Sequence, residues 1–183
     1  MTVPPASSGG YVRHGNGFVQ CGFTLVELMV ALAVLAILLG IAVPSFTEVS
    51  LSGRLRSLAN GLVASATLGR SEAIKRNAVV TLCASSDGAT CAEPGEGDWH
   101  QGWIVVADGT VLHAQSAAPS GYRITAGVTS IAFQPTGLGA TSTSLTICRS
   151  SPSAGSQERV VEISLTGRTS VKTTTAGECP EGS

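Results

Sequence analysis

A long apolar segment near the start of the chain constrains its fold more than any other feature. Residues 23–43 read FTLVELMVALAVLAILLGIAV and contain one charged residue, Glu27. A helix needs about 20 apolar residues to cross about 30 Å of hydrocarbon, whereas a signal peptide has an apolar core of only about 7–15. The sequence therefore predicts a retained transmembrane helix over residues 23–43. Pro44 predicts a kink directly after it, because proline removes a helical hydrogen bond.

The flanking charges give a weak orientation. Residues 1–22 are polar and glycine-rich, and they carry Arg13 and His14 but no acid. Positive charges favour the cytoplasmic side of a bilayer, so we expect the N-terminus in the cytoplasm and the rest of the chain beyond the membrane. Arg54 and Arg56, which follow the span, weaken this expectation.

Glu27 does not fit a simple membrane anchor. A carboxylate near the centre of a span costs at least about 2.5–3.5 kcal/mol, and an intramembrane acid indicates a function and a partner. The span contains no basic residue. A cut between Gly22 and Phe23 would create an α-amino group four residues before Glu27. Alternatively, Glu27 lies near the interface and reaches water, and the residues alone leave both interpretations open.

Residues 22–28, Gly-Phe-Thr-Leu-Val-Glu-Leu, and the apolar run after them resemble the processing signal of type IV pilins and type II secretion pseudopilins. In that family a prepilin peptidase cleaves after the glycine and methylates the new N-terminus. The resemblance implies that residues 1–22 are a leader, that cleavage follows Gly22, and that Phe23 becomes N-methylated. It implies that Glu27 neutralises the Phe23 amine of a neighbouring subunit. One departure is that Gln20-Cys21 stands where such leaders often carry a basic residue.

The same resemblance implies a location and a set of partners. The expected protein is a single-pass subunit of the bacterial inner membrane with its head in the periplasm, later assembled into a pilus or pseudopilus. The implied partners are other pilins or pseudopilins, the prepilin peptidase, the inner-membrane assembly platform and membrane lipid. A plain single-span anchored protein, with an unprocessed leader and no assembly role, is the competing interpretation.

Residues 44–76 predict an amphipathic continuation of the helix. Apolar residues recur there at steps of three and four, namely Leu51, Leu55, Leu58, Leu62 and Ala66. This stripe is suited to packing under a sheet. Three glycines, Gly53, Gly61 and Gly69, are expected to weaken the helix.

Residues 77–183 predict a β-rich head, because short apolar runs alternate with turn residues and no further helical pattern occurs. The expected strands cover residues 79–84, 102–107, 110–115, 122–125, 130–134, 145–149, 159–165 and 169–174. Asp108-Gly109 is a strong hairpin signal. The expected fold class is α+β, with a long N-terminal helix, membrane-spanning in its first half, packed on a small antiparallel head of one sheet or two.

The cysteines favour a disulfide-bonded head. Of the five, the four after the span are Cys83, Cys91, Cys148 and Cys179, and no C-x-x-C pair or nearby histidine suggests zinc. Four cysteines allow three connectivities. We favour Cys83 with Cys91, across a short polar turn, and Cys148 with Cys179 at the tail. Buried free thiols are the alternative.

Several segments of the head resemble the GspH/FimT group of minor pilins. They are residues 70–77 running into 79–83, residues 99–106 with Asp108 after them, and residues 133–137. The resemblance implies a minor pilin or pseudopilin that supports protein secretion or pilus biogenesis, without deciding between a type II secretion system and a type IV pilus. Trp103, Ile104 and Phe133 would equally be core residues in any small β head.

We expect no enzyme activity, metal or cofactor. The histidines, His14, His100 and His113, share no spacing with a nucleophile, and neither a nucleophile elbow nor a P-loop occurs. The acidic residues between 93 and 98 are interpreted as a solvated loop.

DNA binding is the second functional hypothesis. FimT-type members carry a C-terminal basic Gly-Arg-x-Arg motif, and the matching stretch here is residues 167–170, with Ser170 in place of the second arginine. Strand alternation would place Arg168, Ser170 and Lys172 on one face. Two cations could contact phosphates in a salt-sensitive way, but the net charge of -1 gives no overall attraction. A protected, solvated strand edge is the alternative.

Overall fold

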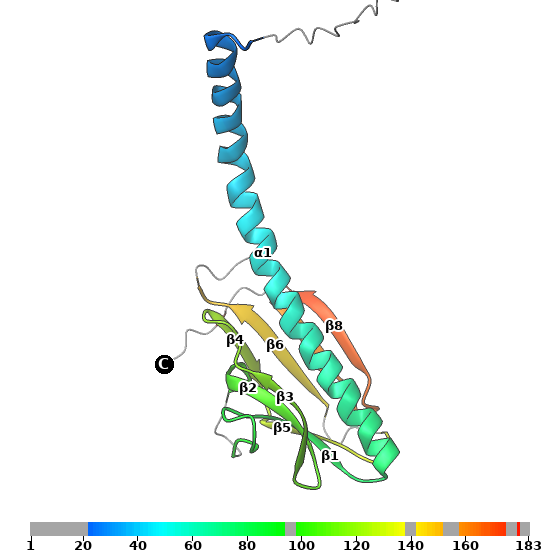
Figure 1. The fold of residues 1–183 in the computed structure, drawn as a ribbon. Helices are drawn as coiled ribbons and strands as arrows, with labels where there is room; N and C mark the ends of the chain where they lie inside the picture. The colour runs from blue at the N-terminus through cyan, green and yellow to red at the C-terminus, as the bar shows by residue number, and fades with distance from the viewer. Residues whose placement is uncertain (1–21, 94–97, 138–141, 152–157, 175–178, 180–183) are drawn as a thin grey trace, which may run out of the picture. The chain divides into compact units, whose positions relative to one another are not determined.

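The computed structural model describes residues 22–93, 98–137, 142–151, 158–174 and 179, without the side chains of residues 41–47. The expected leader, apart from Gly22, lies outside the described residues, and so does the side chain of Pro44, whose kink stays a prediction. The described elements are one helix, α1 (Leu25–Arg76), a 3-10 helix, η1 (Trp99–Gln101), and strands β1 (Val80–Ala84), β2 (Gly102–Ala107), β3 (Thr110–Ser116), β4 (Tyr122–Ala126), β5 (Ser130–Phe133), β6 (Thr143–Arg149), β7 (Glu158–Ile163) and β8 (Thr169–Thr174) (Figure 1).

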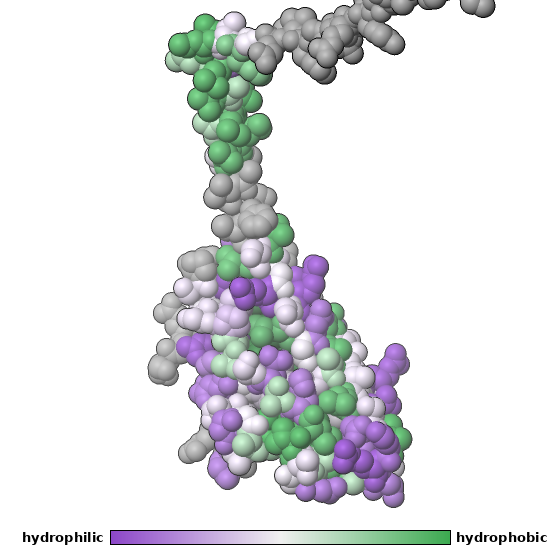
Figure 2. All heavy atoms as spheres, in the orientation of Figure 1, coloured by the Kyte–Doolittle hydropathy of each residue, from purple (hydrophilic) through white to green (hydrophobic). Residues whose placement is uncertain are grey.

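The chain divides into two compact units, residues 1–44 and residues 45–183. In the first unit the described part is the start of α1, and its large apolar side chains from Phe23 to Leu39 are 50–81% exposed. Figure 2 shows these hydrophobic residues gathered around the helix. Within the part of the chain that the structure describes, no helix combines the length and the apolar character that crossing a bilayer requires.

In the second unit, the part of α1 after residue 45 packs on the sheets through the expected stripe. Leu55, Leu58, Leu62 and Ala66 are buried, and Leu51 packs at the edge of the same core. Burying one face of a helix in this way stabilises it more than its intrinsic propensity does.

The end of α1 is closed by a left-handed residue. Asn77 has φ 50°, and the N–H groups of Asn77 and Ala78 donate to the carbonyls of Ile74 and Ala73 over 3.4 and 3.3 Å. Asparagine tolerates this conformation better than most residues, and the two bonds satisfy carbonyls that would otherwise lack partners at the helix end.

The strands form two four-stranded antiparallel sheets. One has the order β3-β2-β1-β5 and the other the order β4-β6-β7-β8. The β2–β3 hairpin turns at Asp108 and Gly109, which both have positive φ, as the sequence predicted. Each expected strand is present with bounds within two residues of those predicted. The α+β fold class, with an antiparallel head in its two-sheet form, is confirmed.

One hydrophobic core joins α1 to the inner faces of both sheets. Its largest members include Trp103 and Phe133, which are fully buried, as is Ile104. The buried polar atoms of its aromatic side chains have partners. The Trp103 indole donates to Ser65 Oγ over 2.9 Å, and the Tyr122 hydroxyl donates to the Leu51 carbonyl over 3.1 Å.

Two of the glycines expected to weaken α1 lie where the helix approaches the sheet. A Cβ at Gly61 would be 3.4 Å from the Trp103 ring, and a Cβ at Gly69 would be only 3.0 Å from Cδ2 of Phe133. These glycines therefore allow the close contact between α1 and the aromatic rings, at the cost of helix propensity.

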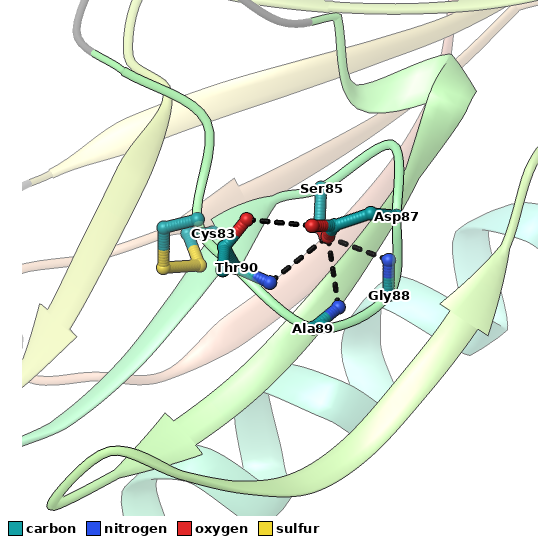
Figure 3. The surroundings of a disulfide bond; sticks show 7 residues. Cys83, Ser85, Asp87, Gly88, Ala89 and Thr90 are labelled. Carbon is teal, nitrogen blue, oxygen red and sulfur yellow. Dashed lines mark hydrogen bonds between the residues drawn. A yellow bond between two sulfur atoms is a disulfide. The ribbon is translucent and has the colours of Figure 1, made fainter.

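The structure contains two disulfides, Cys83–Cys91 and Cys148–Cys179. The first closes a turn built around Asp87 (Figure 3). The Asp87 carboxylate accepts hydrogen bonds from the N–H groups of Thr90 and Ala89, at 2.9 and 2.8 Å, and from the hydroxyls of Thr90 and Ser85. These bonds, above all that from the Thr90 N–H, hold the pKa of the Asp87 carboxyl well below its usual range.

Candidate functional site

The first candidate site is the start of α1, where the expected processing and assembly residues lie. Phe23 is 81% exposed and directly precedes Thr24, whose hydroxyl accepts a hydrogen bond from the Glu27 N–H over 3.2 Å. Thr24 is therefore the N-cap of the helix, and Glu27 stands three residues later, the spacing of a capping box. Sequence analysis missed this role, although the Thr-x-x-Glu spacing was visible.

The helix dipole gives Glu27 a physical reason to be in this turn. An acid in the first turn of a helix is favoured by the helix dipole, whose positive end lies there. In the described part of the chain, however, Glu27 forms no ion pair with a basic side chain. Local capping thus accounts for an acid at this position but leaves its charge available to a partner.

The second candidate site lies in the head, where Arg70 of α1 meets two turns. Arg70 Nε donates to the Gly137 carbonyl over 2.8 Å. A Cβ on Gly167 would be 2.9 Å from Arg70 Cδ and 2.9 Å from the Gly137 oxygen, and one on Gly137 would be 2.9 Å from Cδ1 of Ile74. Both glycines have positive φ. Arg70 therefore joins the turn after β5, in one sheet, to the β7–β8 turn, in the other.

The two residues expected to contact DNA differ in their surroundings. Lys172 pairs with Glu162 at 2.7 Å, and Ser170 donates to the same carboxylate over 3.4 Å, so these two side chains share a face of β8. Arg168, just before β8, is exposed and forms no ion pair with another described residue. Glu162 offsets the charge of Lys172, which weakens the case for a phosphate-binding strand.

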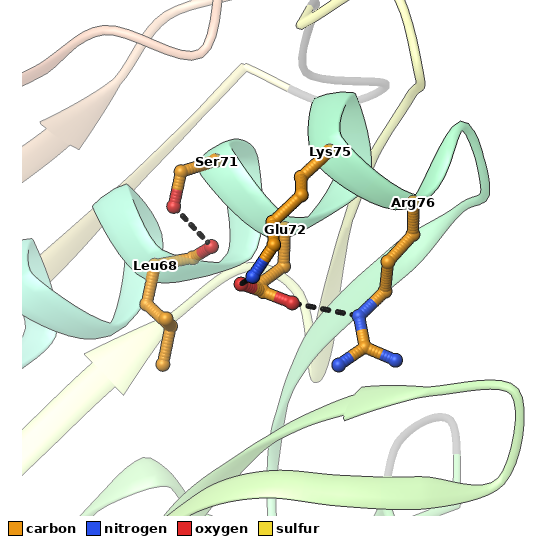
Figure 4. Close-up of polar contacts among 5 residues, drawn as sticks. All are labelled: Leu68, Ser71, Glu72, Lys75 and Arg76. Atoms are coloured by element: carbon orange, nitrogen blue, oxygen red, sulfur yellow. Dashed lines mark hydrogen bonds and ion pairs between the residues drawn. The ribbon is translucent and has the colours of Figure 1, made fainter.

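Cations at the end of α1 are paired as well. Glu72 accepts from Arg76 at 2.7 Å and from Lys75 at 3.3 Å (Figure 4). The hydrogen bond from Arg76, followed by that from Lys75, holds the pKa of the Glu72 carboxyl below its usual value. Water screens such exposed helix pairs, so they stabilise the helix little, but they leave these cations with a nearby partner.

The histidines of the head form no catalytic arrangement in the described residues. His100 Nε2 lies 2.7 Å from Arg123 Nη1 and its Nδ1 lies 3.7 Å from Asp98. Burial, and then the charge of Arg123, lower the pKa of His100. No nucleophilic side chain bonds to it, and no group of three or more His, Cys, Asp or Glu side chains in the described residues could hold a metal ion.

Comparisons with known proteins agree with this arrangement. A family model described as type II transport protein GspH matches residues 58–167, and one described as a prokaryotic N-terminal methylation motif matches residues 18–43. The pilin-like protein PilA1 of Thermus thermophilus is 41% identical over 68 residues, which make up 37% of this chain and 42% of that protein. The chain thus matches less than half the length of this relative.

A solved structure shares the fold. The type IV minor pilin FimU of Pseudomonas aeruginosa has a TM-score of 0.53 and 22% identity, and the match covers 67% of this chain and 91% of that chain. The first family model spans more than half of the present chain. The chain belongs to the GspH family of type II transport proteins, and its residues 18–43 match the prokaryotic N-terminal methylation motif.

Proposed function

We propose that the chain is cleaved after Gly22, N-methylated on Phe23, held in the inner membrane by residues 23–43 and then assembled with other pilins or pseudopilins. Residues 77–183 form its periplasmic head. The prepilin peptidase processes it, and the inner-membrane platform extracts it from lipid into the fibre. The match of residues 18–43 to the methylation motif supports this scheme.

The observation that carries the proposal is the start of α1. Its apolar side chains are exposed, and Glu27 forms no described ion pair. Cleavage before Phe23 creates an amine, and a carboxylate in a lipid-like environment needs a cation. When subunits pack side by side, the Phe23 amine of one subunit meets Glu27 of the next, which sets their axial register.

Intact-mass measurement of the membrane-extracted protein tests the processing step. The expected mass corresponds to a chain that begins at Phe23 and carries one methyl group. A chain that keeps its leader in cells that contain the peptidase contradicts the proposal and supports a plain membrane anchor.

The variant Glu27→Gln tests the assembly step. Glutamine also serves at this position of a capping box, so the variant removes the charge and keeps the local helix start. We expect normal processing and membrane insertion but loss of incorporation into sheared fibres. Glu93→Gln, at an exposed acid of the head that forms no ion pair with another described residue, is the control and should be incorporated normally. Incorporation of Glu27→Gln at the normal level contradicts the proposed role of its charge.

DNA binding through Arg168 and Lys172 remains the alternative. It predicts salt-dependent retention of the protein on DNA that is lost when both residues are changed to alanine. The ion pair between Lys172 and Glu162 does not favour it, so we keep it as the second hypothesis.

A further inference from the structure

A shallow hollow lies between α1 and the turn that joins β7 to β8. Thr67, Arg70, Ser71 and Ile74 line it from the helix, and Gly167 and Arg168 line it from the turn. Its charged lining residues are both arginines, and none of its lining residues is acidic. The hollow is therefore locally positive on a chain whose net charge is -1.

Among the residues that the structure describes, these two arginines differ from the neighbouring cations in having no acidic partner. Lys75 and Arg76 share Glu72, and Lys172 has Glu162. Within the described residues, Arg70 and Arg168 form no ion pair. Arg70 binds the Gly137 carbonyl through Nε, and no described bond uses its terminal nitrogens.

The two hydroxyls that α1 contributes to the hollow are already used as donors. Thr67 Oγ1 donates to the Val63 carbonyl over 2.7 Å, and Ser71 Oγ donates to the Leu68 carbonyl over 2.9 Å. An anion in the hollow would therefore be held mainly by the guanidinium groups, with the hydroxyl of Thr169 at the edge of β8 beside them. A guanidinium presents donors in a planar fork that matches the two oxygens of a carboxylate.

Exposed apolar side chains lie next to this positive hollow. Ile74, which lines it, is 51% exposed, and Leu165, in the tight turn closed by the bond from the Gly167 N–H to the Ser164 carbonyl, is 61% exposed. Two neighbouring arginines with aliphatic side chains beside them suit a protein interface, because arginine is enriched in interfaces and their fully buried centre is more apolar than the rest of the surface.

We propose that this hollow docks a carboxylate-bearing segment of a neighbouring pilin or pseudopilin subunit. Arg168 and Arg70 bind the carboxylate, and Ile74 and Leu165 cover the apolar residues beside it. The inference rests on the proposed function, because it assumes that the head meets another subunit in the fibre.

A nucleic acid fits this surface less well. The neighbouring hollow over β6, β7 and β8 also contains Arg168, but it contains Glu162, so a phosphate chain that follows β8 would meet a carboxylate. A phosphate backbone also gains little from exposed aliphatic side chains, whereas an acidic peptide segment gains from both features.

A photo-crosslinking amino acid at Leu165, in the full-length chain in cells that assemble the fibre, tests the inference. A second crosslinker at Val34, in the apolar part of α1, reports on assembly itself. We expect crosslinks from position 165 to a peptide of another subunit, within a few residues of an Asp or Glu. Arg168→Gln should lower their yield by roughly threefold to tenfold, as the loss of an interfacial charge pair does. Lys172→Gln is the control, because Lys172 pairs with Glu162 and does not line the hollow, and it should leave the yield unchanged.

The outcomes separate the two proposals. Crosslinks at Val34 without crosslinks at 165 overturn the docking surface and keep the proposed function. Crosslinks from position 165 to nucleic acid or lipid also overturn it. So does a protein crosslink whose yield is the same in Arg168→Gln as in the parent protein. If neither position crosslinks to another subunit, the proposed function fails and this inference fails with it.

Discussion

Gly167 shows how one backbone position holds two turns together. Its φ is +68°, and its missing Cβ leaves room for Arg70 and the Gly137 carbonyl. Gly109, in the β2–β3 hairpin, has a similar φ of +74° but nothing within 4 Å of its missing Cβ. Both positions therefore need a left-handed backbone, but only at Gly167 do other atoms lie close to where a Cβ would be.

We predict that Gly167→Ala lowers the free energy of unfolding more than Gly109→Ala does. Both variants bear about 1–2 kcal/mol for a left-handed alanine, but only the first also forces atoms apart, which adds roughly 1–3 kcal/mol. Urea denaturation of the full chain in mild detergent measures both. In an Arg70→Ala background the extra cost should shrink, since the two residues are in contact. Equal costs for the two glycines would contradict the crowding.

Protonation of Asp87 should weaken the turn that its carboxylate organises. The pKa of Asp87 is lower in the folded protein than in the unfolded chain. The charged carboxylate therefore stabilises the turn fully above the unfolded pKa of about 3.9, and this stabilisation is lost as the pH falls from there through the folded pKa. We predict that Asp87→Ala lowers the hydrogen-exchange protection of the Ala89 and Thr90 amides at neutral pH. The difference from the parent protein should narrow as the pH falls below about 4.

Thr90→Val provides the control for this turn. It removes one hydroxyl bond to Asp87 but keeps the backbone bond from the Thr90 N–H. Protection should therefore fall less than in Asp87→Ala. A pH-independent difference between the parent protein and Asp87→Ala would contradict the role of the charged carboxylate.

At the scale of elements, the glycines of α1 give a matched pair. Gly53 is exposed, with nothing within 4 Å of its missing Cβ, whereas Gly69 faces Phe133 at 3.0 Å. We predict that Gly53→Ala raises the free energy of unfolding by roughly 0.5–1 kcal/mol, the usual gain of alanine over glycine in a helix. In Gly69→Ala the new methyl group would push against the Phe133 ring, and the cost of displacing the ring should cancel the gain in helix propensity. Thermal unfolding should therefore show a lower midpoint for Gly69→Ala than for Gly53→Ala. A higher midpoint for Gly69→Ala would show that the ring moves aside freely.

The elements themselves were largely predictable from the sequence. The strands end at residues that favour turns, such as Asp108-Gly109, and the apolar stripe of residues 51–66 fixed the buried face of α1. The partition into two sheets was not predictable, because it depends on pairings between strands far apart in the chain, such as β1 with β5. The contacts of Arg70 with Gly137 and Gly167 were equally hidden, since they join three distant segments. The Thr24 cap was readable and was overlooked.

At the scale of the whole molecule, the two disulfides constrain the head to different degrees. Cys83 and Cys91 are 8 residues apart in sequence, and Cys148 and Cys179 are 31 apart. In the chain-entropy model the first bond contributes about 2–3 kcal/mol and the second about 3–4 kcal/mol. Each bond also has one fully buried member, Cys83 or Cys148, so the packing lost on removal is similar.

We therefore predict that Cys148→Ala with Cys179→Ala destabilises the protein by about 1 kcal/mol more than Cys83→Ala with Cys91→Ala. Both tryptophans, Trp99 and Trp103, are buried in the head, so their fluorescence follows its unfolding in urea. The parent protein treated with a reductant should unfold at the lowest urea concentration, because it loses both constraints at once. The opposite order of the two double variants would show that strain or residual structure, and not the length of the closed segment, governs how these bonds stabilise the head.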